Sequence, residues 1–146
     1  MYRWAILIIL SLSSFSVSTT QHSLPEVLSE VPHPTLSEWD IFIQALIYTE
    51  SRGDATAVGK ANDAGTLQIT PVYVKECNRL LGYEAFTLED RFCPAKSLEM
   101  FELTNSVKNP ERCILKAIKI HNPRAPKSYE QSILCNMKLI KYKMNS

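Results

Sequence analysis

Residues 50–71 read ESRGDATAVGKANDAGTLQITP, and the fold can be reasoned outward from this stretch. It holds three of the four glycines of the chain, together with aspartate and asparagine residues that favour turns. We therefore expect an irregular loop, or a short hairpin in which residues 57–58 pair with residues 66–69. Gly53 is placed to end the helix that precedes the stretch.

The residues before this stretch carry the pattern of an amphipathic helix. Thr35 and Glu38 have the spacing of a capping box, which predicts a helix start at this point. Apolar side chains then recur at helical spacing, at Trp39, Phe42, Ile43, Leu46 and Ile47. Glu50 continues the same stripe, so we expect its carboxyl group to point toward the core or a cleft.

Glu50 is a candidate general acid because of where this helix ends. It falls in the last turn, where the negative end of the helix dipole disfavours a carboxylate, and burial disfavours the charge further. A carboxylic acid that keeps its proton near neutral pH is what glycosidic bond cleavage needs, because the leaving oxygen must be protonated. The alternative is a glutamate at a frayed helix end that turns to solvent.

The rest of the chain predicts further helices. Thr70-Pro71 has the form of a cap followed by proline at the first helical position, and Gly82 closes the apolar series that follows. The later helices are expected to begin at Pro94, at Asn109-Pro110-Glu111 (with a stripe that ends at His121) and at about Lys127. The predicted fold class is mainly α, with about five helices and one small Gly-rich loop or hairpin, in a single domain over residues 35–146.

Two segments together resemble the lytic transglycosylase and goose-type lysozyme-like superfamily. The first is Glu50-Ser51 with the following Asp-x-x-Ala-Val, and the second is Gly-x-x-Gln-Ile-x-Pro over residues 65–71. In that superfamily a Glu-Ser pair ends a helix, and the Gly-x-x-Gln segment follows in a loop beside it. The resemblance covers roughly residues 35–143. It implies a lysozyme-like α+β fold, as in soluble lytic transglycosylase catalytic domains, with the loop or hairpin beside the active site.

A third element of that superfamily is matched in part. The family pattern is an aromatic-Asn-x-Gly turn after a later helix. Here Asn122 matches, His121 replaces the usual tyrosine or tryptophan, and Arg124 stands at the glycine position. Ser128-Tyr129 resembles the element with which the final helix of the family begins.

The resemblance implies a role for each matched residue. Glu50 would be the catalytic acid and then the base, and the serine after it would orient the glutamate or an N-acetyl group. The substrate-binding residues would be Ser51, Gln68, His121, Asn122 and Tyr129. Taken from the residues alone, Gln68 also fits a loop amide bonded to the backbone, and His121 a histidine of the core or a lid. Neither a cofactor nor a metal ion is implied.

A glycosidase that works with two carboxylates would need a partner for Glu50. Asp54 and Asp63 are nearest in sequence, but both lie beside glycine-rich turns, where aspartate commonly caps the backbone. The resemblance implies that no second carboxylate is required. In lytic transglycosylases the substrate's N-acetyl group assists departure of the leaving sugar, and the muramyl 6-hydroxyl then closes an anhydro ring.

We therefore expect cleavage of the β-1,4 bond between N-acetylmuramic acid and N-acetylglucosamine in peptidoglycan, leaving 1,6-anhydromuramyl ends. Two alternatives stay open at this point. One is a hydrolytic lysozyme on the same fold. The other is a catalytically inactive, disulfide-stapled accessory protein that binds the cell wall, which the altered turn after His121 favours.

The first residues have the layout of a secretory signal. Met1-Tyr2-Arg3 is a short basic region, residues 4–12 form an apolar run, and residues 13–20 are rich in small side chains. The apolar run is too short to span a bilayer. We expect a signal peptide over residues 1–18, a linker over residues 19–34, and a location in the periplasm or cell envelope. An uncleaved anchor and a buried helix are the alternatives.

All four cysteines lie in the part of the chain that this layout predicts to be exported: Cys77, Cys93, Cys113 and Cys135. An even number of cysteines in an oxidising compartment favours disulfides. Spacing favours Cys77–Cys93 and Cys113–Cys135, while the sequence alone allows three connectivities. A zinc site of four cysteines is the competing interpretation, and it lacks any pair separated by only two to four residues.

The charge is distributed unevenly along the chain. Residues 105–146 carry nine basic and two acidic residues, a net charge of +7, whereas residues 1–104 carry −6. A basic flank suits an anionic polymer such as the cell wall or a membrane surface, and a solvated helix face explains it equally well. As partner we expect peptidoglycan strands and no nucleic acid. A secretion or conjugation apparatus stays open, and we expect a monomer.

Overall fold

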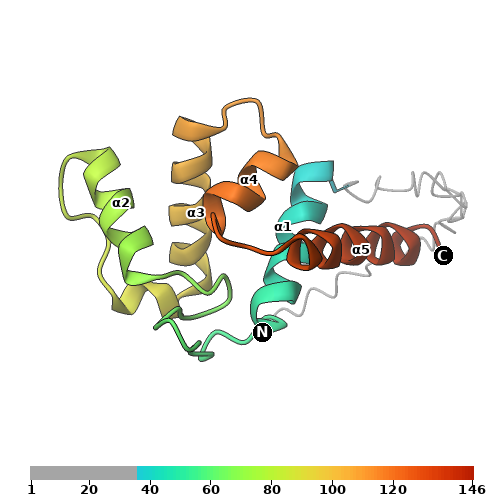
Figure 1. The fold of residues 1–146 in the computed structure, drawn as a ribbon, viewed down its shortest axis with the longest axis horizontal. Helices are drawn as coiled ribbons and strands as arrows, with labels where there is room; N and C mark the ends of the chain where they lie inside the picture. The colour runs from blue at the N-terminus through green and yellow to red at the C-terminus, as the bar shows by residue number, and fades with distance from the viewer. Residues whose placement is uncertain (1–35) are drawn as a thin grey trace, which may run out of the picture. The chain divides into compact units, whose positions relative to one another are not determined.

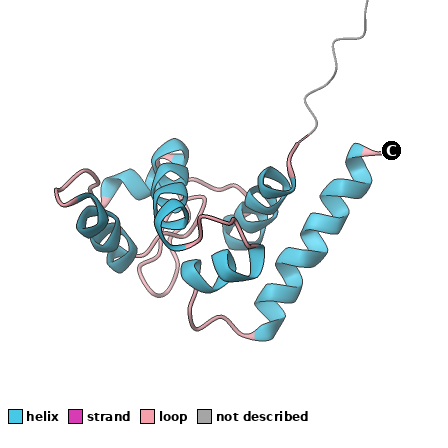
Figure 2. Cartoon of the chain, turned by 90° about the horizontal axis from the view of Figure 1, so that it is seen from above, coloured by secondary structure: helices cyan, strands magenta, loops and turns pink. Residues whose placement is uncertain are grey.

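The computed structural model describes residues 36–146, and these form a mainly helical unit (Figure 1). The elements are α1 (Glu38–Ser51), α2 (Pro71–Leu81), the 3-10 helix η1 (Glu89–Phe92), α3 (Pro94–Lys108), α4 (Ile114–His121) and α5 (Lys127–Met144). The predicted mainly α fold class is confirmed, and Figure 2 shows only helices and loops in this part of the chain. The expected signal peptide and linker lie outside the described residues. Between residues 36 and 146, every helix is too short or too polar to cross a bilayer.

The start of α1 differs from the prediction. Ser37 caps the helix, because its Oγ accepts the Asp40 N–H (3.2 Å) while the Asp40 carboxylate accepts the Ser37 N–H (3.0 Å). This is a capping box two residues later than the predicted Thr35 and Glu38. These hydrogen bonds lower the pKa of Asp40. The predicted pair has the same spacing, and its Thr35 lies outside the described residues.

The end of α1 also shifts by one residue. Arg52, rather than Gly53, is the first residue in the left-handed region, with a φ of 57°, and its N–H donates to the Tyr48 carbonyl (3.2 Å). Gly53 follows with a φ of 88°. Glu50 is thereby left in the last helical turn, which contains no basic side chain.

The glycine-rich segment after α1 is a loop held by two isolated bridges, Val58 with Ala64 and Ala64 with Ile69. The sequence predicted either a loop or a short hairpin, and the structure shows a loop. Gly65 has a φ of 75°, and a Cβ on it would lie 1.8 Å from the Arg91 carbonyl oxygen. Only glycine therefore lets this loop approach η1 so closely.

The starts of most of the later helices agree with the sequence prediction, and one does not. α2, α3 and α5 begin where the sequence predicts, and Thr70 caps α2 by accepting the Tyr73 N–H (3.2 Å). The predicted start at Asn109-Pro110-Glu111 is wrong. The Asn109 side chain instead accepts the Cys113 N–H and donates to the Cys113 carbonyl (both 3.0 Å), so these residues form a turn and the helix begins at Ile114.

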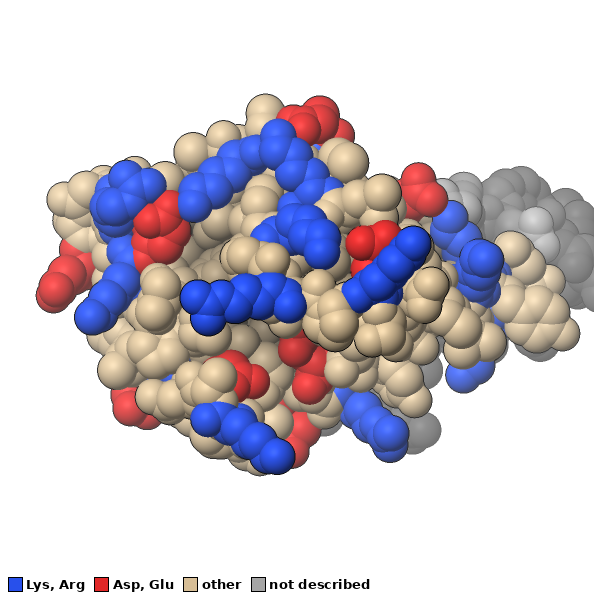
Figure 3. All heavy atoms as spheres, viewed as in Figure 1, with Lys and Arg blue, Asp and Glu red and all other residues tan. Residues whose placement is uncertain are grey.

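Basic side chains cover much of the face that α4 and α5 present in Figure 3. Two of these lysines have acidic partners, since Lys116 pairs with Glu111 and Lys141 with Glu38, each at 2.8 Å. The basic residues of α4, α5 and their connecting loop that form no ion pair within residues 36–146 are Lys119, Arg124, Lys127, Lys138 and Lys143. This surface is the basic flank that the sequence predicts.

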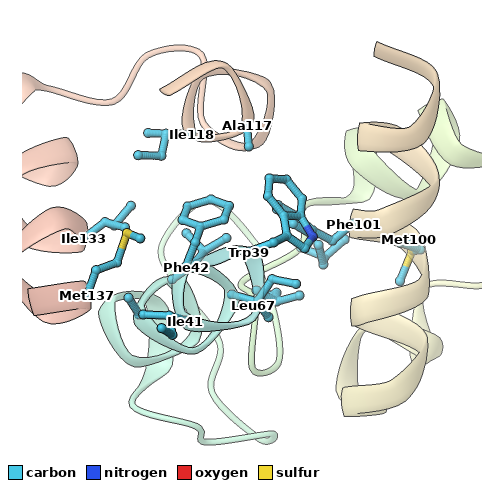
Figure 4. Packing of buried hydrophobic residues seen from close by; sticks show 14 of the residues in the cluster. Trp39, Ile41, Phe42, Leu67, Met100, Phe101, Ala117, Ile118, Ile133 and Met137 are labelled. Atoms are coloured by element: carbon cyan, nitrogen blue, oxygen red, sulfur yellow. The ribbon is translucent and has the colours of Figure 1, made fainter. Parts of the chain in front are cut away.

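The core surrounds α1 (Figure 4). Six of its residues are buried: Trp39, Ile41, Phe42, Ile43, Ala45 and Leu46. The rings of Trp39, Phe42 and Phe101 lie with centroids 5.2–6.1 Å apart, and Ile118 of α4 and Ile133 of α5 belong to the same buried cluster. Burial of each large apolar side chain contributes about 1.5–3 kcal/mol. α1 is therefore a firmly packed support for the residues at its C-terminal end.

The four cysteines are unbonded in the structure. Cys77 is buried, and its Sγ lies 3.5 Å from the Met100 carbonyl oxygen and from Thr104 Oγ1. Cys93 precedes α3, seven residues before Met100, which is about 10 Å along a helix. The expected Cys77–Cys93 bond is absent for this reason. The expected Cys113–Cys135 bond is absent too, and both of those side chains are exposed.

Candidate active site

Glu50 meets the ends of two other helices. It is the penultimate residue of α1, and its side chain is 13% exposed, so it faces inward as the helix register predicts. Tyr129, in the first turn of α5, donates a hydrogen bond from its hydroxyl to Glu50 Oε1. His121, the last residue of α4, places Nε2 3.2 Å from the same oxygen. Three residues singled out in the sequence are thus brought together from three helices.

Tyr129 is placed to act as a permanent donor. Burial raises the pKa of its phenol, and the charge of Glu50 and the hydrogen bond to it raise that pKa further. A raised phenol pKa means that the hydroxyl keeps its proton through neutral and alkaline pH. Glu50 Oε1 therefore has a donor whether or not the carboxyl group is ionised.

His121 is enclosed by aromatic rings. Its side chain is 4% exposed, and the rings of Tyr73 and Phe101 approach it edge to face with centroids at 5.7 Å. Its Nδ1 is buried and has no hydrogen-bond partner within residues 36–146. The imidazole is thus held by packing, and Glu50 is the polar side chain that its Nε2 approaches.

The two oxygens of Glu50 have different surroundings. Oε1 faces both Tyr129 and His121. Oε2 has no hydrogen-bond partner among the described residues. The protein therefore engages Oε1 and not Oε2.

Ser51 fastens the glycine-rich loop to the end of α1. Its Oγ donates to the Thr66 carbonyl (2.9 Å) and accepts the Gly53 N–H (3.1 Å). Ser51 makes no hydrogen bond to the Glu50 carboxyl group. Its hydroxyl thus holds the loop and does not orient the preceding glutamate.

Gln68 is held in an unusual backbone conformation within that loop. Its φ is 48°, in the left-handed region that non-glycine residues rarely adopt. The side-chain amide donates to the carbonyls of Gly65 (2.9 Å) and Ala57 (3.2 Å), while its Oε1 has no hydrogen bond within the described residues. The amide nitrogen thus stabilises the loop, and the amide oxygen is left without a hydrogen bond among the described residues.

The comparison with known protein families identifies the family of the chain. Residues 36–120 match the family described as Transglycosylase SLT domain, which is more than half of the chain. The chain belongs to this family. Comparison with curated proteins and with solved structures gives no match. Membership assigns the SLT domain a function of the peptidoglycan lytic transglycosylase type in general, with peptidoglycan as the polymer that it binds.

Asp54 and Asp63, the candidates for a second carboxylate, are both engaged in turns of the SLT domain. Asp54 Oδ1 accepts the N–H (2.8 Å) and the hydroxyl (2.7 Å) of Thr56, and these bonds lower the pKa of Asp54. Asp63 Oδ1 accepts the Ala61 N–H (3.0 Å). Both aspartates hold turns, as their neighbouring glycines suggest. The same part of the chain contains no cluster of three side chains suited to a metal ion.

Asn122 ends α4 of the SLT domain directly after His121. Its N–H donates to the Ile118 carbonyl (2.9 Å) and its carbonyl accepts the Ala125 N–H (3.1 Å), while its side chain has no hydrogen bond within residues 36–146. A cavity of about 180 Å³ lies beside this turn. It is lined by Thr70, Val72, Tyr73, Glu76, Thr104, Lys108, Ile120, His121 and Pro123. Asn122 thus follows directly after His121, which approaches Glu50, and makes no hydrogen bond to Glu50 itself.

Arg91 is a residue of the site region that the sequence reasoning missed. It is 5% exposed, and its guanidinium donates to the carbonyls of Leu88 (2.7 Å) and Asn62 (2.6 Å) rather than to a carboxylate. In the SLT domain it therefore ties the glycine-rich loop to η1. Nothing in its sequence context distinguishes a buried arginine from an exposed one, so no sequence signal could have found it.

Proposed function

We propose that this SLT domain cleaves the β-1,4 bond between N-acetylmuramic acid and N-acetylglucosamine as a lytic transglycosylase, with Glu50 as acid and then as base. The observation that carries the proposal is the environment of Glu50. Its side chain is mostly buried, with Oε1 facing Tyr129 and His121 and Oε2 without a hydrogen bond among the described residues. One oxygen is fixed, and the other can exchange a proton with the glycan.

In the first step, Oε2 of protonated Glu50 gives its proton to O4 of the departing sugar as the C1–O4 bond breaks. The N-acetyl oxygen of the muramyl residue attacks C1 and forms an oxazolinium ring, so the positive charge stays on the substrate. General acid catalysis of this kind contributes ~10²–10⁴ in rate. The hydrogen bond from Tyr129 stabilises the carboxylate that results.

In the second step, the Glu50 carboxylate takes the proton of the muramyl 6-hydroxyl. The oxygen of that hydroxyl attacks C1 and displaces the N-acetyl oxygen, which closes the 1,6-anhydro ring. Glu50 is protonated again at the end, and no water is consumed. The engagement of Asp54 and Asp63 in turns supports this route, because it needs a single carboxylate.

The remaining matched residues support these steps. We assign Gln68 and Asn122 to substrate binding, because Gln68 Oε1 and the Asn122 side chain have no hydrogen bond within residues 36–146. Ser51 holds the loop that carries Gln68, since its hydroxyl bonds to a carbonyl of that loop. Tyr129 holds the glutamate itself.

The test is a digest of purified peptidoglycan with products read by mass. We expect the wild-type protein to release fragments one water lighter than hydrolysis gives, and Glu50→Gln to release none. Glu84→Gln is the matched control, because Glu84 is exposed and forms no ion pair within the described residues. It should cleave as the wild type does.

Each other outcome contradicts a stated part of the proposal. Fragments of hydrolytic mass would make the protein a lysozyme. Equal digestion by Glu50→Gln would remove Glu50 from the mechanism. A folded wild-type protein that binds peptidoglycan and releases nothing would be an inactive wall-binding protein.

We further infer that residues 1–18 direct export to the periplasm or cell envelope, because the polymer lies there. The measurement is the N-terminal mass of the protein recovered from fractionated bacteria that express the full chain. We expect recovery outside the inner membrane, with the signal removed. Cytoplasmic protein that retains residues 1–18 would contradict this inference.

A further inference from the structure

The C-terminal half of α5 has apolar side chains on two opposite faces. Ile133 and Met137 are buried in the core, whereas Leu139 and Tyr142 are 53% and 71% exposed. In Figure 2, α5 is the helix that ends at the C label, and it lies at the edge of the unit. At about 100° per residue, the exposed Cys135 falls on one stripe with Leu139 and Tyr142. Among the described residues, this outer stripe has no partner element.

A groove between α1 and α5 adjoins the stripe. It has a volume of about 290 Å³ and is lined by Gln44, Tyr48, Asn136, Leu139, Ile140 and Lys143. Leu139 belongs to both the stripe and the groove, and Tyr48 of α1 adds a third large side chain that is 53% exposed. We call the surface of Tyr48, Leu139 and Tyr142 the outer α5 surface. Large apolar side chains that are exposed together, with a polar rim, mark binding surfaces.

Positive charges flank the outer α5 surface on both sides. Lys138 and Lys143 lie about 60° and 80° from the middle of the stripe, in opposite directions around the helix. Both are exposed, and neither forms an ion pair within residues 36–146. Lys141, by contrast, is neutralised by Glu38 at 2.8 Å. The surface therefore offers two free cations beside its apolar side chains, and the complementary partner is both apolar and anionic.

A bilayer surface with anionic lipids has both of these properties. Lysine packs its alkyl stem against apolar groups while its ammonium stays in water, and tyrosine favours the boundary between lipid and water. A peptidoglycan strand is a polar polymer that offers few apolar groups to Leu139 and Tyr142. A second copy docked by two-fold symmetry would bring the lysines of both chains together, and like charges oppose that contact.

We propose that the outer α5 surface binds reversibly to the surface of a bilayer that contains anionic lipids. Leu139 and Tyr142 enter the headgroup region, and Lys138 and Lys143 meet the lipid phosphates. The helix lies on the membrane and does not cross it. Leu139 and Tyr142 are about 15 and 20 Å along α5 from Tyr129, so the contact does not involve the side chains around Glu50. The proposal stands independently of the proposed function.

The first test uses Cys135 as a probe position on the stripe. The full chain with Cys93→Ser and Cys113→Ser carries a polarity-sensitive fluorophore on Cys135, while Cys77 is buried and escapes labelling. It is mixed with vesicles of phosphatidylglycerol and phosphatidylcholine, or of phosphatidylcholine alone. We expect the emission to move to shorter wavelength with the anionic vesicles only.

The control for this test carries the same fluorophore on Cys93, an exposed residue before α3, in the chain with Cys113→Ser and Cys135→Ser. Its emission should not move. The proposal is overturned by an unchanged emission at Cys135, by equal shifts at Cys135 and Cys93, or by an equal response to the neutral vesicles. Emission from Cys135 that is already at short wavelength without vesicles also overturns it, because another part of the chain would then cover the stripe.

The second test measures, by vesicle flotation, how the unlabelled full chain partitions onto the anionic vesicles. We expect Lys138→Gln, Lys143→Gln to lower the partition coefficient about 10- to 30-fold, because each lysine at the surface contributes to the attraction. Leu139→Ser, Tyr142→Ser should lower it about 10-fold through lost apolar contact. Added salt should weaken the binding of the wild type, because it screens the lysines. Residues 1–35 are the same in every variant, so a change in partition reports on α5.

Lys60→Gln, Lys75→Gln is the matched control for charge. It also removes two exposed lysines that form no ion pair in the described part of the chain, and it should bind vesicles as the wild type does. An equal loss in this control would assign the binding to net charge and overturn the proposal. So would unchanged partition in both outer-surface variants. If the same substitutions instead weaken sedimentation with purified peptidoglycan and leave vesicle binding unchanged, the occupant is the wall polymer and the proposal is wrong.

Discussion

The hydroxyl of Tyr129 donates a hydrogen bond to Glu50, which lies 79 residues earlier in the sequence. Removal of this one oxygen atom tests its effect on the reaction. Burial raises the pKa of this phenol, so the hydroxyl keeps its proton and donates to Glu50 at every working pH. Tyr129→Phe removes the donor and keeps the ring. We expect kcat to fall about 10- to 100-fold.

Tyr142→Phe is the control for Tyr129→Phe, because Tyr142 lies on the same helix with 71% of its surface exposed. It should leave kcat unchanged.

Sequence reasoning at this scale predicted the orientation of Glu50 but not its contacts. Orientation follows from helix register, and Trp39, Leu46 and Glu50 share one stripe, as the packing confirms for the two apolar residues. The contacts of Glu50 with Tyr129 and His121 depend on how α4 and α5 cross α1. Local patterns contain no information about that crossing, so both residues entered through the family resemblance as substrate-binding residues.

At the scale of elements, the approach of the glycine-rich loop to η1 positions Gln68. Gly65→Ala would place a methyl group 1.8 Å from the Arg91 carbonyl oxygen and would strain a residue with a φ of 75°. We expect the variant to lose about 1–3 kcal/mol of unfolding free energy from the forced displacement, with a further cost for the left-handed backbone. Urea denaturation measures the first effect. Activity should fall as well, because the displaced loop carries Gln68.

Gly53→Ala separates the steric part of this loss from the backbone part. Gly53 has a φ of 88°, yet nothing lies within 4 Å of a Cβ built on it. It should lose only about 1–2 kcal/mol, the cost of a left-handed residue with a side chain. Equal losses in the two glycine variants would show that the contact with Arg91 is not tight.

Element boundaries were predicted well wherever the cap is local and unambiguous. Thr70 and Pro71 supply both a capping oxygen and a proline that fits only the first turn, and α2 begins there. The predicted start of α4 is wrong because of Asn109, a residue of the type that commonly caps helices. Asn109 is buried, and its side chain bonds to the backbone of Cys113. Burial of that amide depends on tertiary packing, which the local pattern does not encode.

At the scale of the whole molecule, the basic flank borders the site through the loop between α4 and α5. Both ends of this loop are fixed to Glu50, through His121 on one side and Tyr129 on the other. Arg124 and Lys127 lie between them, exposed and without an ion pair within residues 36–146. Two cations therefore lie at the rim of the site.

These rim cations should favour peptidoglycan strands, because their peptide stems bring carboxylates to the cations. We expect the double variant Arg124→Gln, Lys127→Gln to raise KM on peptide-bearing peptidoglycan about 2- to 10-fold, as for weak exposed charge pairs, with kcat unchanged. Added salt should raise the wild-type KM in the same direction, because it screens exposed charges. The control is Lys138→Gln, Lys143→Gln, two unpaired lysines about 14 and 21 Å beyond Tyr129 along α5. An equal rise of KM in the control would mean that the flank attracts the polymer by its overall charge and that the rim has no separate role.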